Sequence, residues 1–245
     1  MTSFRRRIQI SSVVDGLQGE ARAVLEDDFH HFRVSVSHQG NIVTEVTGSA
    51  IRNPYITCPS ASAQLASLIS MPLNSVANSV TRVTDASLQC THMLDLAGLA
   101  IAAAARGIRH RRYDIEVPRR VAGLTLGTLH RDDVKLLEWA IEDSLILSPP
   151  PYAGINLREG MARWALTTLD EDEAEAALVL RRCMVISRGR ERNLDLQLNA
   201  LSTGNCFAQQ PERAEKSLRI VGSTLDFSEY ADALCAEDQD WLDFK

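Results

Sequence analysis

The clearest pattern in the chain is a strict alternation of apolar and polar positions that begins at residue 32. Phe32, Val34 and Val36 fall on one face of an extended chain, and the residues between them are polar. The stretch 38–41, His-Gln-Gly-Asn, is typical of a tight turn, and an apolar segment returns over 42–46. The pattern predicts a β-hairpin with one face buried.

Helical spacing of apolar residues follows the hairpin. The stretch 57–60, Thr-Cys-Pro-Ser, is typical of a helix start, because hydroxyl groups can cap the first turn and proline is tolerated there. We predict a short helix from this start to Ser70 and a second one over 73–83. A third helix is predicted from Thr91, as its cap, to Gly107, and its apolar character on most sides indicates that it is buried.

A change of composition near residue 108 predicts a boundary between two domains. Residues 106–112 are rich in arginine, and alternating segments typical of antiparallel strands follow over 113–147. Two helices are then predicted, one over 157–169 and a longer one capped by Asp170. The acidic C-terminal tail is weakly patterned, so we expect it to be mobile.

These elements together predict an α+β protein with two units. Residues 1–108 should form an antiparallel sheet with helices, and residues 109–245 a second antiparallel sheet with two helices. A chain of 245 residues is long enough for both units to bury a hydrophobic core.

Net charge and cysteine content narrow the class of protein. The net charge of -6 argues against a nucleic-acid partner, whose binding depends on neutralising phosphates. The absence of a long apolar run argues against a signal peptide and a membrane-spanning helix. Five cysteines, an odd number, indicate reduced thiols. We therefore expect a cytoplasmic protein without nucleic-acid or membrane partners, and a homodimer stays an open alternative.

Two cysteines stand just ahead of predicted helices. Cys58 and Cys90 would each lie at a helix N-terminus, where backbone N–H groups stabilise a thiolate and lower the thiol pKa. His92 follows Cys90 closely, and Asp95 lies one helical turn further, where it can orient the imidazole. Cys58, Cys90 and His92 are donors that zinc or iron accepts, although their spacing is not that of a zinc finger. The alternative is that all three are buried core residues.

A second candidate group lies just before the predicted hairpin. His30 and His31 stand beside the acidic pair 27–28, and a His–carboxylate pair is the usual general acid–base arrangement. In a strand the two histidines point to opposite faces, so at most one of them faces a given site. Arg52 can bind a carboxylate or phenolate, and Tyr55 can donate or accept a proton. Surface exposure is the alternative for the histidines, and turn packing is the alternative for Arg52 and Tyr55.

Common catalytic signatures are absent from the sequence. It contains no P-loop, no Gly-x-Gly-x-x-Gly, no Gly-x-Ser-x-Gly and no His-Glu-x-x-His. Nucleotide-dependent chemistry and the commonest hydrolase classes therefore lose support.

The order of these motifs resembles a bacterial domain-of-unknown-function family, the one numbered twenty-eight eighty-nine. The resemblance rests on the succession of hairpin, Cys58-Pro, two short helices, Cys90-Thr-His92 and buried helix. Further matching segments are Arg112-Tyr113, Leu129-His-Arg-Asp132, Ala176-Ala-Leu-Val-Leu-Arg-Arg182 and Gly222-Ser-Thr-Leu-Asp-Phe227. Together the segments span most of the chain.

This resemblance implies a role in the breakdown of aromatic compounds, including lignin-derived dimers. It implies a cofactor-independent lyase that cleaves a carbon–carbon bond of a phenolic substrate by deformylation or decarboxylation and releases formaldehyde or carbon dioxide. In such a reaction a base removes a proton, an arginine holds the anion, and a histidine or tyrosine moves the proton. We expect the site in a cleft between the units. The candidate catalytic residues are His30, Arg52, Tyr55, His92 and Asp95.

Residues 32–105 also resemble the scaffold proteins of iron–sulfur assembly. Those proteins have a small sheet followed by helices, with cysteines at the sheet–helix junction and before the last helix. Cys58 and Cys90-Thr-His92 match the first and last positions, but no cysteine lies between them to match the middle one. Two alternatives to the lyase stay open. One is a metal-binding or scaffold-type module that holds zinc or iron with Cys58, Cys90 and His92, and the other is a non-enzymatic small-molecule-binding accessory protein.

Overall fold

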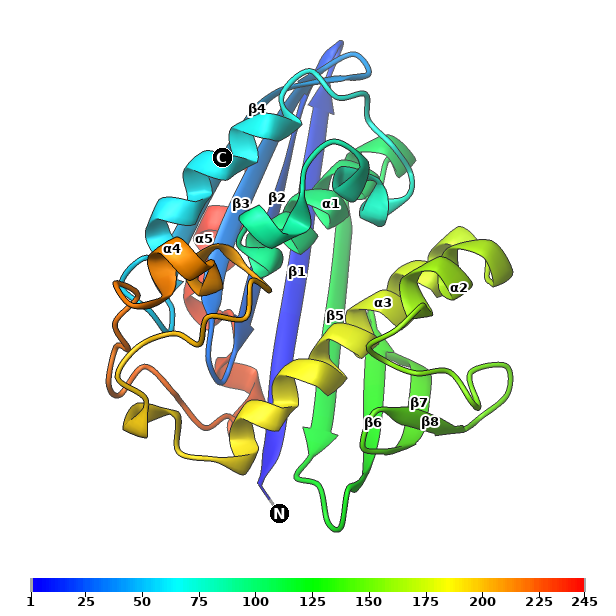
Figure 1. Ribbon diagram of the computed structural model, residues 1–245. Helices are drawn as coiled ribbons and strands as arrows, with labels where there is room; N and C mark the ends of the chain where they lie inside the picture. The colour runs from blue at the N-terminus through cyan, green and yellow to red at the C-terminus, as the bar shows by residue number, and fades with distance from the viewer. Residues whose placement is uncertain (1, 245) are drawn as a thin grey trace. The chain divides into compact units, whose positions relative to one another are not determined.

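An eight-stranded antiparallel sheet runs through both halves of the chain. The computed structural model describes residues 2–244, in which the strands follow the spatial order β4-β3-β2-β1-β5-β6-β7-β8 (Figure 1). From β1 to β8 the bounds are Ser3–Asp15, Gln18–Asp27, His31–Gln39, Ile42–Arg52, His110–Pro118, Leu124–Arg131, Val134–Glu142 and Leu145–Ser148. The predicted α+β class is confirmed. The two antiparallel sheets expected from the sequence are halves of this one sheet, because β1 and β5 are hydrogen-bonded neighbours.

The chain divides into two compact units that each combine separate segments. Unit A contains Ile8–Arg111, Asp195–Leu225 and the chain from Cys235 onwards. Unit B contains the chain up to Arg7 together with Arg112–Leu194 and Asp226–Leu234. The passage from Arg111 to Arg112 lies close to the division expected at residue 108. Unit A also includes C-terminal segments, however, and no local composition could show this.

The centre of unit A is formed by β2 and β3, with the end of β2 buried on both faces and β3 alternating between buried and half-buried positions. Phe32 of β3 lies beside the His92 ring of α1 (Thr91–Arg106), so the apolar face predicted from the alternation packs against this helix. The other face of β2 presents Val24, which forms a small buried cluster with Cys235 and Leu242. The register of β3 with β4 confirms the predicted hairpin.

One face of the unit A strands is covered by α1 (Figure 1). As predicted, the helix ends at Gly107, whose backbone is in the left-handed region. The residue at its N-cap, however, is Cys90 and not Thr91. Gly98 is required for close packing, because a Cβ atom there would lie 2.3 Å from the carbonyl oxygen of Ala77. The tight approach packs the middle of α1 against the 3-10 helix that begins at Ala77.

The two short helices expected after the hairpin are 3-10 helices. Their bounds are Cys58–Leu68 and Ala77–Arg82, and Ala86–Leu88 forms a third 3-10 turn. A proline lies in the first turn as predicted, but the Thr57 hydroxyl does not cap this turn. It makes a hydrogen bond of 2.6 Å with the hydroxyl of Ser217 instead. Apolar spacing over such short segments does not distinguish the two helix types.

In unit B two helices pack beside the second group of strands. Their bounds are Met161–Thr168 (α2) and Glu171–Ile186 (α3). Asp170 caps α3 as predicted, with its carboxylate accepting the N–H of Glu173 at 2.8 Å. Trp139 of β7 is fully buried beside Tyr152, and Tyr152 in turn contacts Trp164 of α2. This aromatic cluster joins the sheet of unit B to its shorter helix.

Between α3 and residue 244 the helices are all short. Their bounds are Ser187–Glu191, Leu194–Leu196, Phe207–Gln209, Pro211–Ala214 (α4), Ala231–Ala233, Ala236–Asp238 and Gln239–Leu242 (α5). We expected a mobile acidic tail, but Cys235, Asp238 and Leu242 are buried. They pack on the side of β2 and β3 opposite α1 (Figure 1). Among residues 2–244, no helix has the length and apolar character that a membrane span requires.

Candidate functional site

The sharp turn between β2 and β3 places an aspartate and a histidine together. The N–H of Asp27 donates to the carbonyl oxygen of His30 at 2.8 Å and closes the turn. Oδ1 of Asp27 accepts the backbone N–H groups of Phe29 and His30, both at 2.7 Å, which is a typical aspartate turn. The same oxygen lies 3.1 Å from Nδ1 of His30. Four consecutive residues thus build a buried His–carboxylate pair.

The first turn of α1 brings a second histidine to this pair. The ring of His92 stacks on the ring of His30, with centroids 4.0 Å apart. Phe32 lies beside both rings, at 5.6 Å from His30 and 6.0 Å from His92. The ligating atoms of Asp27, His30 and His92 all lie within 4.8 Å of one another, which is compatible with a metal ion. We call these three residues the His30 cluster.

The hydrogen bond to Asp27 determines what His30 can do chemically. When Nδ1 carries the proton that it donates to the carboxylate, Nε2 is left as a proton acceptor. Among residues 2–244, the ring hydrogen bonds found for His30 run through Nδ1. The carboxylate also stabilises the imidazolium that forms when Nε2 takes up a proton. The His30 cluster therefore has the arrangement of a general base.

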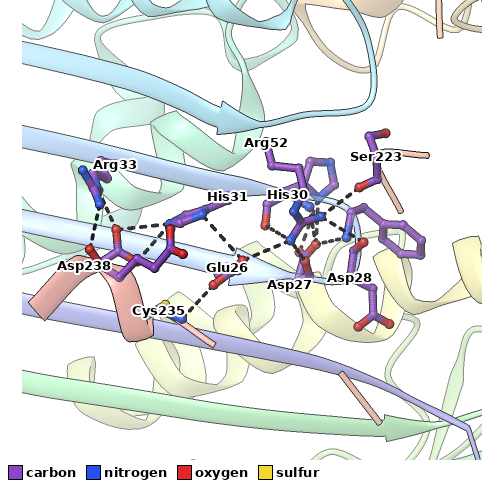
Figure 2. A network of polar contacts seen from close by, with 12 residues as sticks. Glu26, Asp27, Asp28, His30, His31, Arg33, Arg52, Ser223, Cys235 and Asp238 are labelled. Carbon is purple, nitrogen blue, oxygen red and sulfur yellow. Dashed lines mark hydrogen bonds and ion pairs between the residues drawn. The ribbon is translucent and has the colours of Figure 1, made fainter. Parts of the chain in front are cut away.

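The neighbouring histidine belongs to a second cluster on the opposite face of the sheet (Figure 2). Nδ1 of His31 lies 3.5 Å from the Glu26 carboxylate, and Nε2 lies 2.9 Å from the carboxylate of Asp238 in the C-terminal segment. Arg33 also donates to Asp238. Burial raises the pKa of Asp238, but the hydrogen bonds from His31 and Arg33 outweigh this effect and hold the pKa below its usual value. We call Glu26, His31, Arg33 and Asp238 the His31 cluster.

The structure brings the side chains of two of the five residues predicted as catalytic into contact, and a third, Arg52, contacts the main chain of the same turn. His30 and His92 are in ring contact, so His30, and not His31, faces α1. Asp95 lies one helical turn beyond His92, as the spacing predicted, and is half-buried. Tyr55 is engaged with another segment of unit A, because its hydroxyl donates to the side chain of Gln197 at 3.3 Å.

Arg52 donates to main-chain carbonyl oxygens, which agrees with the alternative of turn packing and differs from the predicted binding of a substrate anion. Its guanidinium donates to the carbonyl oxygens of Asp27 at 2.5 Å and of Asp28 and Ser223 at 3.0 Å each. It also lies 3.3 Å from the Glu26 carboxylate (Figure 2). Donors that are directed at carbonyl oxygens stabilise the turn itself.

The two cysteines named as alternative metal ligands are core residues. Neither Cys58 nor Cys90 belongs to a metal-compatible group found within residues 2–244, although His92 does. Burial, with the Cys90 thiol nearby as the second cause, raises the pKa of Cys58 far above its usual value. Burial likewise raises the pKa of Cys90 to about 12. The predicted lowering of these thiol pKa values is wrong, because desolvation exceeds the effect of the backbone N–H groups.

Two aspartates in the clusters, Asp27 and Asp238, were not among the predicted site residues. Asp27 was visible only as an acidic neighbour of His30, although an aspartate at a strand end that can close a turn is a usable signal. Asp238 lies 207 residues after His31, and no local pattern connects them. Long-range pairing of this kind follows only from the fold.

The fold and the site define an α+β protein with two buried His–carboxylate clusters on opposite faces of one sheet. No family model matches the chain, and no curated protein matches it at a significant level. The resemblance noted from the sequence therefore stays a prediction, and function has to be argued from the site.

Proposed function

We propose that the protein is a lyase that cleaves a carbon–carbon bond in a small phenolic compound, with His30 as its general base. The observation that carries the proposal is the 3.1 Å contact between Nδ1 of His30 and the Asp27 carboxylate. This contact gives His30 the tautomer and orientation that a base requires. The family resemblance supplies the substrate class, and base-initiated cleavage needs no cofactor.

In a deformylation, Nε2 of His30 removes the proton from a hydroxymethyl group of the substrate. The O–H electron pair becomes the second bond of formaldehyde, the carbon–carbon bond breaks, and its electron pair stays on the remaining carbon. The imidazolium then returns the proton to that carbon, so that R–CH2OH gives R–H and formaldehyde. In a decarboxylation Nε2 takes the proton of the carboxyl group, the carbon–carbon bond breaks with release of carbon dioxide, and the imidazolium returns the proton to the remaining carbon, so that R–COOH gives R–H and carbon dioxide. Asp27 stabilises the imidazolium in both cases.

The surroundings of His30 are apolar and aromatic. Phe29 and Phe32 lie next to the His30 ring, with centroids at 6.1 and 5.6 Å. Both rings are buried, and they lower the local dielectric constant around the His30 imidazole. The stacked His92 ring supplies a second group that can move a proton.

The direct test is incubation with a panel of lignin-type phenolic dimers and measurement of formaldehyde and carbon dioxide. We expect one of the two products from the wild-type protein and a large loss of turnover in His30→Gln. His110→Gln is the matched control, because His110 is an exposed histidine of the same unit. Binding without turnover across the panel would instead favour a small-molecule-binding accessory protein. Turnover that is equal in both variants would remove His30 from the reaction.

A metal site is the second candidate, because Asp27, His30 and His92 present three donor atoms within 4.8 Å. Two imidazoles and a carboxylate suit zinc or ferrous iron and leave coordination positions for a substrate or water. These ligands differ from the set predicted from the sequence, with His92 as the only shared member.

Metal analysis separates the two candidates. Under the metal proposal, protein purified without a tag retains zinc or iron, or binds added Zn²⁺ in calorimetry, and Asp27→Asn weakens that binding. Cys58→Ser and Cys90→Ser serve as controls and should bind as the wild type does. A wild-type protein that neither retains metal nor binds Zn²⁺ would leave the metal-free base as the function of the cluster.

A further inference from the structure

Arg52 holds the turn that carries both Asp27 and His30. Nη1 donates to the carbonyl oxygens of Asp28 and Ser223, and Nη2 donates to that of Asp27. Nη2 is also 3.4 Å from the carbonyl oxygen of His30. One guanidinium thus contacts three of the four residues of the turn, including both members of the pair.

The chemistry of these contacts requires an arginine. Its planar group presents several N–H donors in fixed directions, so one side chain can satisfy carbonyl oxygens that point toward a common centre. A lysine at this position keeps the charge but offers a single nitrogen. The contacts also supply a hydrogen-bond donor to the carbonyl oxygen of Asp27 in this buried turn and a second donor to that of Asp28.

The side chain of Arg52 is itself held in place by neighbouring segments. Its Nη2 is 3.3 Å from the carboxylate of Glu26, whose other oxygen accepts the N–H of Cys235 at 2.7 Å. The N–H of Leu225 donates to the carbonyl oxygen of Asp28 at 2.7 Å, beside the contact made by Arg52. Figure 2 shows Glu26 between Arg52 and His31, with contacts to both. The turn is therefore supported from the 223–225 segment and from the C-terminal segment.

We propose that Arg52 is a positioning residue that fixes the 27–30 turn and thereby holds the ring of His30 against the Asp27 carboxylate. Its effect on catalysis rests on the proposed function, but its effect on the His30 ring does not. Arg52 acts through main-chain atoms and makes no contact with the substrate in this role.

The first measurement is the tautomer of His30 by ¹⁵N nuclear magnetic resonance of the substrate-free protein. In the wild type we expect the proton on Nδ1, as the contact with Asp27 requires. In Arg52→Ala the turn loosens, and the ring shifts toward the Nε2–H tautomer that is common for histidine in water. Guanidinium ion added to this variant should restore part of the Nδ1–H population.

The second measurement is turnover. Misplacement of a base by about 1 Å lowers turnover by up to about 10²-fold, so we expect a loss of kcat of this order in Arg52→Ala with a smaller change in KM. Arg52→Lys should keep the charge near Glu26 and still show most of the loss. Arg22→Ala is the control, because Arg22 is in the same unit and binds a carboxylate and a carbonyl oxygen away from the turn.

The outcomes separate the two proposals. An unchanged His30 tautomer in folded Arg52→Ala or Arg52→Lys would overturn the positioning role, whatever the turnover. A changed tautomer in a protein whose wild type shows no turnover on any phenolic compound would support the positioning role and contradict the lyase. If Arg52→Ala does not fold, the His30 tautomer in Arg52→Lys tests the positioning role instead. An equal tautomer change in Arg22→Ala would show a general loosening of unit A and also overturn the proposal.

Discussion

The His30 and His31 clusters are built from adjacent residues but are chemically different. Both nitrogens of the His31 ring lie near carboxylates, Nδ1 near Glu26 and Nε2 near Asp238. In the His30 cluster, Asp27 contacts Nδ1 and the ring face stacks on His92. A histidine held on both sides is suited to anchoring, whereas one held on a single side keeps a nitrogen for proton transfer. The same residue types therefore serve structure on one face of the sheet and, in our proposal, chemistry on the other.

The two clusters also differ in the chain segments that they join. The His30 cluster joins a turn to the helix that follows it within the same unit. The His31 cluster joins the sheet to a segment more than two hundred positions away, and Arg33 adds a cation to it. A buried carboxylate such as that of Asp238 needs hydrogen-bond donors such as His31 and Arg33 around it, because an isolated charge in the interior is unfavourable by several kcal/mol.

Replacing each histidine by glutamine should give the largest effect, and it tests most directly whether the two clusters have different roles. Positioned general bases contribute about 10²- to 10⁴-fold to rate, so His30→Gln should lower turnover by that order. Its thermal midpoint should fall less than that of His31→Gln, because the Asp27 carboxylate keeps its two main-chain N–H donors. His31→Gln should do the opposite, with turnover retained and the midpoint lowered. Steady-state assays and calorimetry of both variants provide the check. Equal losses of turnover in the two variants would show that the faces do not divide these roles.

Removing Asp238 should destabilise the protein strongly, since the variant leaves His31 and Arg33 without their shared partner. Breaking a buried ion pair by deleting one member costs about 3–5 kcal/mol, which we expect for Asp238→Ala in urea unfolding. Glu237→Ala is the control, because the Glu237 side chain is exposed and its loss should change the unfolding free energy by less than about 0.5 kcal/mol. A small effect of Asp238→Ala would mean that the C-terminal segment is held mainly by its apolar contacts.

The same aspartate should make stability depend on acid. Its pKa is lower in the folded protein than the value of about 3.9 expected in the unfolded chain. Asp238 therefore contributes stability above the unfolded value, and this contribution is lost as pH falls through the folded value. Unfolding free energies measured from about pH 5 downward should fall less steeply in Asp238→Asn than in the wild type. Asp195 and Asp226, whose pKa values are also lowered, contribute equally to both proteins, so the difference isolates Asp238.

The sequence was most informative where the determinants are local. The alternation at Phe32, the aspartate cap at Asp170 and the glycine at the end of α1 each depend on a few neighbouring residues, and each prediction is confirmed. The choice of 3-10 over α-helix after Thr57 depends on packing against distant segments and was not predictable. The acidic tail was predicted to be mobile, but Cys235 and Asp238 in it are buried. Their contacts are with distant strands, so no local pattern could show this burial.

Within the candidate site, residue types were predicted better than residue roles. His30 and His92 were selected separately, and only the fold shows that their rings are stacked. Arg52 was selected to bind a substrate anion, with turn packing as the alternative, and its donors are directed at carbonyl groups of the turn as that alternative describes. Spacing along the chain indicates which side chains share an element. It does not indicate whether a donor is directed at a substrate or at the main chain.

Thiol labelling should give the smallest effect. It tests whether the cysteines take part in chemistry alongside the His30 cluster. Burial raises the pKa of both Cys58 and Cys90, so at neutral pH they are protonated and react slowly with alkylating reagents. Cys206 is half-buried and should be labelled first. Mass spectrometry of samples taken over time, with and without urea, identifies the order. Rapid labelling of Cys58 or Cys90 in the native protein would contradict this assignment, because it would require an accessible thiolate, and it would return both residues to the list of candidate reactive groups.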